Sequence, residues 1–168
     1  MEALFPSPTG LRQGEVAQLV VFGLDEHRYA LRLSAVEQIV RVVEITPLPK
    51  APNIILGVVN IHGRIVPVYN IRVRFRLPDR EFLLSDHLIV AHTARRTVAL
   101  VVDTVAGVTT TTDGEVTDAN GISPSLEYIE GVVKLEDGLV FIHDLDTFLS
   151  IEEEIRLEDA LMPTQEQA

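Results

Sequence analysis

The chain is built from short apolar segments that follow one another closely, with turn-forming residues between them. The segments are rich in Val, Ile and Leu, and branched side chains favour strands because they pack well on a pleated surface. Asp-Gly pairs, at 113–114 and inside "EDG" at 136–138, are strong hairpin signals. A series of about ten short strands with few helices predicts an all-β fold, either a sandwich or small barrels. The expected strands occupy 16–24, 27–33, 57–61, 64–71, 86–93, 97–103, 105–112 and two stretches within 127–145.

Two of these segments, 19–22 and 99–102, are apolar at consecutive positions. A strand with one wet face alternates between apolar and polar residues, whereas a strand covered on both faces does not. The runs therefore predict strands that contact protein on both sides, as in two barrels packed against each other. A length of 168 residues suits one domain or two small lobes that share a core.

The two ends of the chain are expected to lie outside this β-rich body. Prolines and glycines in 1–15 predict a flexible tail. Ser150 and Glu153 are spaced to cap the start of a helix reciprocally. Ile151 and Ile155 lie one helical turn apart and are expected to dock that helix on the body. We therefore divide the chain into a tail at 1–15, a two-lobed domain at 16–150, and an acidic C-terminal helix and tail at 151–168.

Three stretches between or within the strands contain prolines or mixed helix and strand signals. In 34–45, a possible capping pair (Ser34 and Glu37) precedes β-branched residues, which predicts a short turn or helix leading into a strand. The three prolines of 46–52 exclude a regular element. Pro67 has no backbone donor, so we expect its strand to be bulged or to lie at a sheet edge.

The net charge of −11 bears on possible partners. Such a field repels phosphate groups, which argues against nucleic acid and anionic membranes. Against this background four arginines stand close together, and they mark either a docking edge or side chains that simply face water. They are Arg72, Arg74, Arg76 and Arg80.

No residue pattern indicates catalysis or metal binding. The absence of cysteine excludes disulfides and thiolate chemistry. None of the five histidines pair at metal-binding helical spacing, so no metal or cofactor is expected. The glycines at 57 and 63 do not have the spacing of a phosphate loop, and "GISPS" at 121–125 predicts a turn, not a nucleophile.

The sequence also predicts a cytoplasmic protein without membrane insertion. No apolar run approaches the roughly 18 residues that span a bilayer. The first ten residues, "MEALFPSPTG", contain an acid and two prolines where a signal peptide would need a cationic start and an apolar stretch.

The segment from Ile61 to Arg64 predicts a tight turn, because Gly63 can adopt the positive φ that such turns demand. An exposed strand edge beside it would need protection in a monomer. The hairpin therefore either presents a surface to a partner or serves only the fold, and the residues alone leave both possibilities open.

The stretch "ILGVVNIHGRIVPVYNIRVRF" at 55–75 resembles the central signature of CheW-type chemotaxis coupling proteins. In that signature a glycine, a hydrophobic strand, N-L-R-G, a proline and D-L-R follow in this order. The segments 19–40, 98–108 and 128–149 are similar to the opening hairpin, the second-lobe motif and the closing hairpin of the same family. The resemblance extends over 16–149.

This resemblance implies a fold of two intertwined five-stranded SH3-like β-barrels that share a hydrophobic core, with a short C-terminal helix. It also implies a non-catalytic adaptor in chemotaxis-like signal transduction. Proteins of this type dock to a CheA-type histidine kinase and to the cytoplasmic tip of chemoreceptors, so these are the implied partners.

The resemblance further implies which residues contact partners. Val36, Gln38 and Ile39 match the partner-facing segment of the family. Gly57 and His62 match positions at the surface that contacts kinase and receptor.

Three more positions fall where the second lobe of the family helps to line a receptor groove: His87, Ala99 and Val108. Each assignment has a plain structural alternative. Ile39 and Val108 could belong to the core, and His87 could be an ordinary surface residue.

The chain also departs from the family pattern. His62 stands where the family usually has arginine, Asn70 replaces aspartate, and Gln38 replaces glutamate. Histidine offers at most two donors where arginine offers five, so the partner surface is expected to differ. The alternative function is a small-molecule-binding or regulatory β-barrel domain outside chemotaxis, which would show a deep pocket with convergent polar groups.

Overall fold

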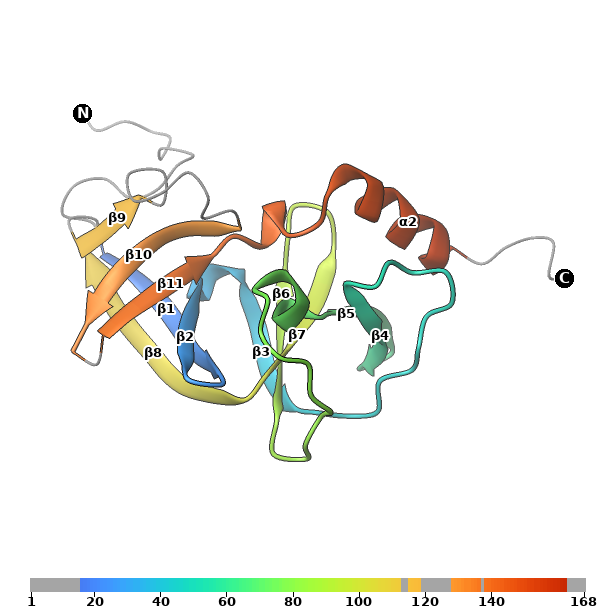
Figure 1. The fold of residues 1–168 in the computed structure, drawn as a ribbon, viewed down its shortest axis with the longest axis horizontal. Helices are drawn as coiled ribbons and strands as arrows, with labels where there is room; N and C mark the ends of the chain where they lie inside the picture. Colours follow the sequence, from blue (N-terminus) through green and yellow to red (C-terminus); the bar gives the residue numbers. More distant parts are fainter. Residues whose placement is uncertain (1–15, 113–114, 119–127, 137, 163–168) are drawn as a thin grey trace, which may run out of the picture. The chain divides into compact units, whose positions relative to one another are not determined.

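The structure is a computed structural model that describes residues 16–112, 115–118, 128–136 and 138–162. Its strands form two sheets, and the chain divides into two compact units (Figure 1). Unit 1 consists of the chain up to Val36 together with Asp103–Leu145, and unit 2 consists of Glu37–Val102 together with Asp146–Ala168. Each unit is thus assembled from two separate stretches of sequence, which is the interleaved connectivity expected of intertwined barrels.

Unit 1 holds a six-stranded sheet in the order β8-β1-β2-β11-β10-β9. Its innermost cluster combines Leu19 and Val21 of β1 with Val133, Val140 and Ile142 from the closing hairpin. The sixth strand is the three-residue β9, which extends the sheet beyond β10. The strands are β1 (Val16–Leu24), β2 (His27–Arg32), β8 (Thr104–Thr112), β9 (Val116–Asp118), β10 (Ile129–Leu135) and β11 (Gly138–His143).

Unit 2 holds a five-stranded sheet in the order β3-β6-β7-β5-β4. Its core includes Val66 and Val68 of β5, Leu88 and Val90 of β6, and Ala99 of β7. The strands are β3 (Val36–Arg41), β4 (Ile55–Ile61), β5 (Arg64–Tyr69), β6 (His87–His92) and β7 (Thr97–Val102). Helices within the described residues include the 3-10 turns η1 (Leu33–Ala35) and η4 (Leu145–Thr147), the short α1 (Ile71–Arg74) and the C-terminal α2 (Ile151–Leu161).

The predicted all-β class with two β-rich units and a short C-terminal helix is confirmed. Unit 2 has the five strands expected of each barrel, whereas unit 1 has a sixth, the short β9 beside β10. The predicted hairpins are present as the antiparallel pairs β1–β2, β4–β5, β6–β7 and β10–β11. The segment 34–45 contains the end of η1 followed by β3, so the expected turn leading into a strand is confirmed. The capping pair of Ser34 and Glu37 is wrong, because no side chain caps η1. The turn signal at 113–114, the loop at 121–125 and the tail at 1–15 lie outside the described residues.

The expected sheet edge at Pro67 is wrong, because β5 lies inside the sheet between β4 and β7. The β4–β5 ladder does contain a bulge, but it lies in β4 between Ile55 and Gly57 and not at Pro67. The two-residue turn makes Ile61 and Arg64 the first hydrogen-bonded pair, and such pairs alternate along an antiparallel ladder. Pro67 therefore faces Val58 at a non-hydrogen-bonded position, where no amide donor is needed. The pairing of β5 with β7 begins only at Val68, one residue later.

The cluster of arginines at 72–80 is neither a docking edge nor a set of solvated side chains, with one exception. Arg72 is buried and donates to the carbonyl of Pro78. Arg74 pairs with Glu153 of α2, and Arg80 pairs with Asp86. Only Arg76 of these four is exposed, so most of the basic charge is used inside unit 2.

The capping box predicted for the C-terminal helix is confirmed. The amide of Glu153 donates to Ser150 Oγ at 3.1 Å, and the amide of Ser150 donates to Glu153 Oε1 at 2.9 Å. The predicted docking face is wrong, because Ile151 and Ile155 are exposed and Leu157 is the helix residue that is fully buried. The helix instead contacts its unit through Leu157 and through ion pairs between its glutamates and arginines of unit 2.

Candidate docking surface

Strand β3 presents alternate residues to solvent along its whole length. Glu37, Ile39 and Arg41 are exposed, and the residues between them are partly buried. Side chains alternate between the two faces of a strand, so the three exposed residues share one face. β3 is also an edge strand of its sheet, which leaves this face accessible from the side.

Glu37 connects this face of β3 to the beginning of two other strands. Its Oε1 accepts from Arg64 Nη2 of β5 at 3.1 Å, and its Oε2 accepts from Thr97 Oγ1 of β7 at 3.1 Å. Arg64 Nη1 also lies 3.4 Å from Thr97 Oγ1. Hydrogen bonds, first from Arg64 and then from Thr97, hold the pKa of Glu37 below its usual range, so the carboxylate stays charged.

The turn between β4 and β5 carries His62 at its tip. His62 has φ +52° and Gly63 has φ +87°, and two consecutive positive values are typical of the type I′ hairpin. Among residues with a side chain, His is one of those enriched at positive φ. The amide of Gly63 donates to Asn60 Oδ1 at 2.7 Å, which fixes the turn. The predicted hairpin thus projects the His62 side chain into solvent.

The name "Glu37 surface" is used below for the exposed residues around the Glu37–Arg64 pair and the neighbouring turn. Ile39 is 38% exposed and Ile65 is 59% exposed, so two aliphatic side chains accompany the charged pair and the turn. Mixed surfaces of this kind, with apolar anchors beside charges, are suited to protein contacts. The Glu37 surface consists of Glu37, Ile39, His62, Arg64 and Ile65, whereas the expected contact residue Gln38 is partly buried and points to the opposite face of β3.

Gly57 is placed by the close approach of two backbones. It lies on β4 with φ +152°, and a Cβ there would stand 2.3 Å from the carbonyl oxygen of Thr46. Thr46 and Val58 form a β-bridge through two hydrogen bonds, which pins the proline-rich segment against β4. The requirement for glycine at this buried position is therefore explained by packing inside unit 2.

The remaining residues expected to contact partners are scattered. Ala99 has no accessible surface and belongs to the core of unit 2, and His87 is half-buried on β6. Val108 on β8 belongs to unit 1 and is 54% exposed, so the alternative that placed it in the core is wrong. Val36 is partly buried at the first position of β3.

Glu37, Arg64 and Ile65 were missed as site residues. The signal for Glu37 and Arg64 was their opposite charge, but they are 27 residues apart in the chain and only the fold brings them together. Ile65 was detectable as a large apolar residue directly after a turn, a place where side chains are often exposed.

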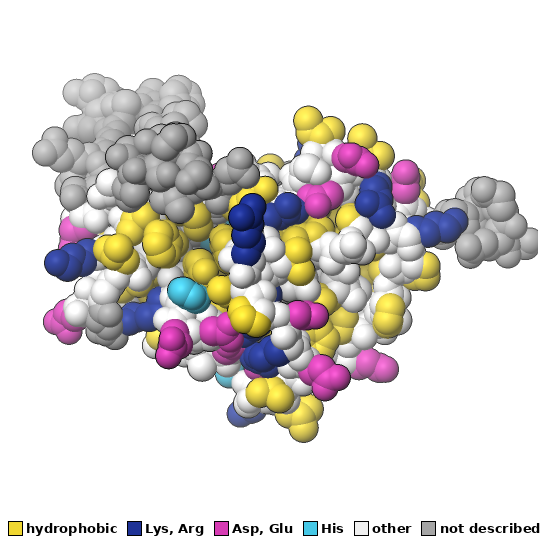
Figure 2. Space-filling model, viewed as in Figure 1, with side chains coloured by type: hydrophobic (Ala, Val, Ile, Leu, Met, Phe, Trp, Pro, Cys, Tyr) yellow, Lys and Arg dark blue, Asp and Glu magenta, His cyan; other side chains and the backbone are white. Residues whose placement is uncertain are grey.

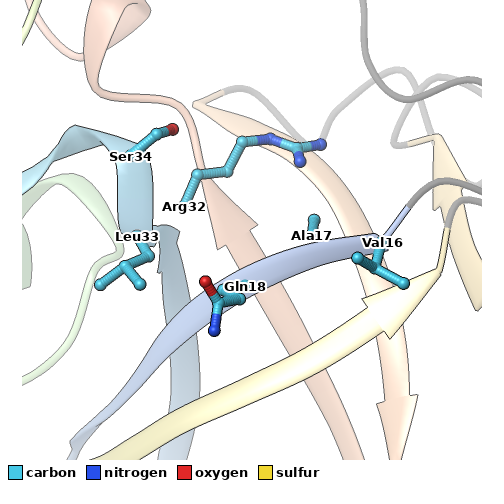
Figure 3. Close-up of a pocket in the computed structure, with 6 residues that line it drawn as sticks. All are labelled: Val16, Ala17, Gln18, Arg32, Leu33 and Ser34. Carbon is cyan, nitrogen blue, oxygen red and sulfur yellow. The ribbon is translucent and has the colours of Figure 1, made fainter.

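Unit 1 contains a hollow of about 350 Å³ that tests the alternative of a small-molecule site. Its main charged group, Arg32, is engaged by Glu130, with Nε 2.8 Å from Oε2. The lining side chains do not converge, because Gln18 and Leu33 point one way and the guanidinium of Arg32 points another (Figure 3). The hollow therefore lacks the arrangement of polar groups expected of a specific ligand pocket.

Within the described residues, no group of His, Asp and Glu is placed to hold a metal ion. In the same part of the chain, no helix has the length and hydropathy required to cross a membrane.

Comparison with known proteins gives a consistent set of matches. A model of the CheW-like domain matches residues 18–153. The chemotaxis protein CheW of Rhizobium meliloti is 28% identical over 138 residues, which are 81% of this chain and 89% of that protein. The chemotaxis protein CheW of Thermotoga maritima is 28% identical over 144 residues, which are 86% of this chain and 93% of that protein. The crystal structure of the scaffolding protein TtCheW from Thermoanaerobacter tengcongensis matches with a TM-score of 0.75 and 26% identity, covering 83% of this chain and 96% of that one.

Proposed function

Because the chain belongs to the CheW-like domain family, we propose that it is a non-catalytic coupling protein that links chemoreceptors to a CheA-type histidine kinase. The match covers most of the chain and nearly the full length of its relatives, which supports a protein with the whole coupling domain. Coupling needs only complementary surfaces, so no catalytic group is required. A place of action in the cytoplasm follows from this role, since the kinase and the receptor tip are there.

Within this function, we assign the Glu37 surface to the contact with the regulatory domain of the kinase. The observation that carries the assignment is the exposed Glu37–Arg64 pair, which links the edge strand β3 to β5, together with the exposed isoleucines near each member along the chain, Ile39 and Ile65. Aliphatic side chains supply the burial energy of a contact, and the charged pair beside them supplies orientation. A modest affinity is enough, because many such links act together in an array.

Co-purification tests both the function and the surface. The chain is mixed with the CheA-type kinase and a cytoplasmic receptor fragment from the same genome, and complexes are separated by gel filtration. All three components are expected to elute together, and receptor control of kinase phosphorylation is expected to require the chain. If the chain binds neither protein, the coupling function is wrong.

The surface is tested by Ile39→Ser and Ile65→Ser. Each removes an exposed aliphatic side chain, so the fold is expected to persist while kinase affinity falls by about tenfold. The matched control is Leu84→Ser, because Leu84 is 88% exposed and lies outside the Glu37 surface. Equal losses for Leu84→Ser and Ile65→Ser would place the kinase contact elsewhere on the chain.

A further inference from the structure

The C-terminal helix α2 has an apolar stripe that faces away from its own unit. Ile151 is 81% exposed, Ile155 is 56% exposed, and Met162, which follows the last turn, is 67% exposed. At about 100° per residue these three positions fall within roughly 40° of one another around the helix. Figure 2 shows hydrophobic side chains standing out along the outer side of this helix, with acids between them.

The opposite side of α2 already has its partners. Leu157 is fully buried, Glu153 pairs with Arg74 at 2.5 Å, and Glu154 pairs with Arg96. The outer stripe is therefore not needed to attach the helix to unit 2. Three large exposed aliphatic side chains aligned on one helix are instead the pattern of a helix that packs against another.

The acids that flank the stripe are not neutralised like those on the inner side. Glu152 and Asp159 lie on one side of it and have no ion pair among the described residues, while Glu158 on the other side is 3.4 Å from Arg96 and half-exposed. Asp159 also stands in the last turn, where the helix dipole disfavours a negative charge. Its position is thus unfavourable for the helix itself, which argues for an electrostatic role outside it.

This combination selects one kind of occupant. A second copy would bring acids against acids on a chain of net charge −11, and an anionic membrane would be repelled in the same way. An amphipathic helix with an apolar stripe bordered by Lys or Arg satisfies both features, since its stripe covers the isoleucines and its cations face the flanking acids. We propose that the outer stripe of α2 is a docking site for a cationic amphipathic helix of another protein.

This site is separate from the Glu37 surface and does not depend on the coupling function. The probe is a synthetic amidated peptide of about 16 residues, made of leucine and lysine with the leucines at helical spacing. A peptide of the same composition in scrambled order, with no apolar stripe, is the control ligand. Binding to the whole chain is measured by fluorescence anisotropy in about 0.1 M NaCl, and the contact is mapped by nitrogen-15 NMR.

The patterned peptide is expected to bind, with chemical-shift changes concentrated on α2. Ile155→Ser should weaken it by about tenfold, since one aliphatic contact is removed. Asp159→Asn should weaken it by about threefold and reduce the dependence on salt. Leu84→Ser, with a similarly exposed side chain elsewhere, should bind like the unchanged chain. Circular dichroism checks that each variant is folded.

Three results would overturn the proposal. Equal binding of the scrambled peptide would mean that the acids attract any cation without using the stripe. Self-association of the free chain that Ile155→Ser abolishes would make a second copy the occupant. Binding of anionic phospholipid vesicles that shifts the same residues would make the stripe a membrane contact.

Discussion

Two of the arginine–carboxylate pairs in unit 2 have the same chemistry but differ in how far they are buried. Arg80 binds both carboxylate oxygens of Asp86, at 3.1 and 2.8 Å, and the side chain of Asp86 is 2% exposed. Arg64 Nη2 binds Glu37 Oε1 at 3.1 Å, and the two side chains are 49% and 29% exposed. The carboxylate of the first pair is buried, whereas both side chains of the second pair are partly exposed.

The difference indicates which pair serves the fold and which is available for function. Asp86 also accepts from the amide of Leu83, so its carboxylate organises the loop that joins α1 to β6. A buried carboxylate cannot lose its partner without a large cost. An exposed pair contributes little to stability and is screened by salt, and so its residues can be exchanged or engaged by a partner. Burial, more than ion-pair chemistry, thus separates structural from functional charges here.

The largest effect is expected for Asp86→Ala. The change removes the carboxylate that accepts from Arg80 and from the Leu83 amide, while Arg80 keeps its hydrogen bond to the Glu81 carbonyl. We expect the free energy of unfolding to fall by about 3 kcal/mol. Denaturant unfolding followed by circular dichroism measures this loss. Glu81→Ala in the same loop is the control, because the side chain of Glu81 is exposed and its removal should change stability by less than about 0.5 kcal/mol. Similar losses for the two variants would break the comparison.

The next effect concerns pH and comes from unit 1. Burial lowers the pKa of His143 to about 3, whereas in the unfolded chain a histidine takes up its proton near pH 6.5. Below pH 6.5 the imidazole of His143 binds a proton in the unfolded state but stays neutral in the folded state. Stability is therefore lost as the pH falls from about 6.5 toward 3, by up to about 1.4 kcal/mol per pH unit.

This pH dependence also separates His143 from Glu37. The pKa of Glu37 is lowered on folding, so its contribution is present above the ordinary range of a glutamate and is lost only at lower pH. Unfolding measured between about pH 6.5 and 5 reports mainly on histidine. His143→Leu should flatten the slope in that interval, and a slope that remains would assign it to another group.

Whether an interaction in the fold or the candidate site could be predicted from the sequence depended on how far apart its two residues lie in the chain. The hairpin at Ile61–Arg64 and the capping box of Ser150 and Glu153 follow from neighbouring residues, and both were predicted. The pairing of Glu37 with Thr97, 60 residues away, depends on strand order, which no local pattern encodes. The position of the Pro67 strand in its sheet was predicted wrongly for the same reason. Whether the missing backbone donor of Pro67 excludes an inner strand depends on which strands lie beside it.

Salt should distinguish the two pairs directly. Raising NaCl from about 0.05 to 0.5 M shortens the Debye length severalfold, which weakens exposed ion pairs more than buried ones. The destabilisation by Asp86→Ala is expected to persist at high salt. Glu37→Gln is expected to leave thermal unfolding unchanged at either salt concentration while reducing kinase affinity at low salt. A clear loss of thermal stability in Glu37→Gln would show that the exposed pair also holds the fold.

The smallest effect on stability, with an effect on binding, is expected for His62→Arg. Position 62 has positive φ, and both residues carry a Cβ, so the change should cost about 0.5 kcal/mol or less. The change adds a permanent positive charge two residues before Arg64. Kinase affinity should therefore change and should depend more steeply on salt, because a permanent charge has been added to the surface. If the pull-down affinity and its salt dependence equal those of the unchanged chain, position 62 does not belong to the docking surface. The contrast between Asp86 and Glu37 would not be affected by that result.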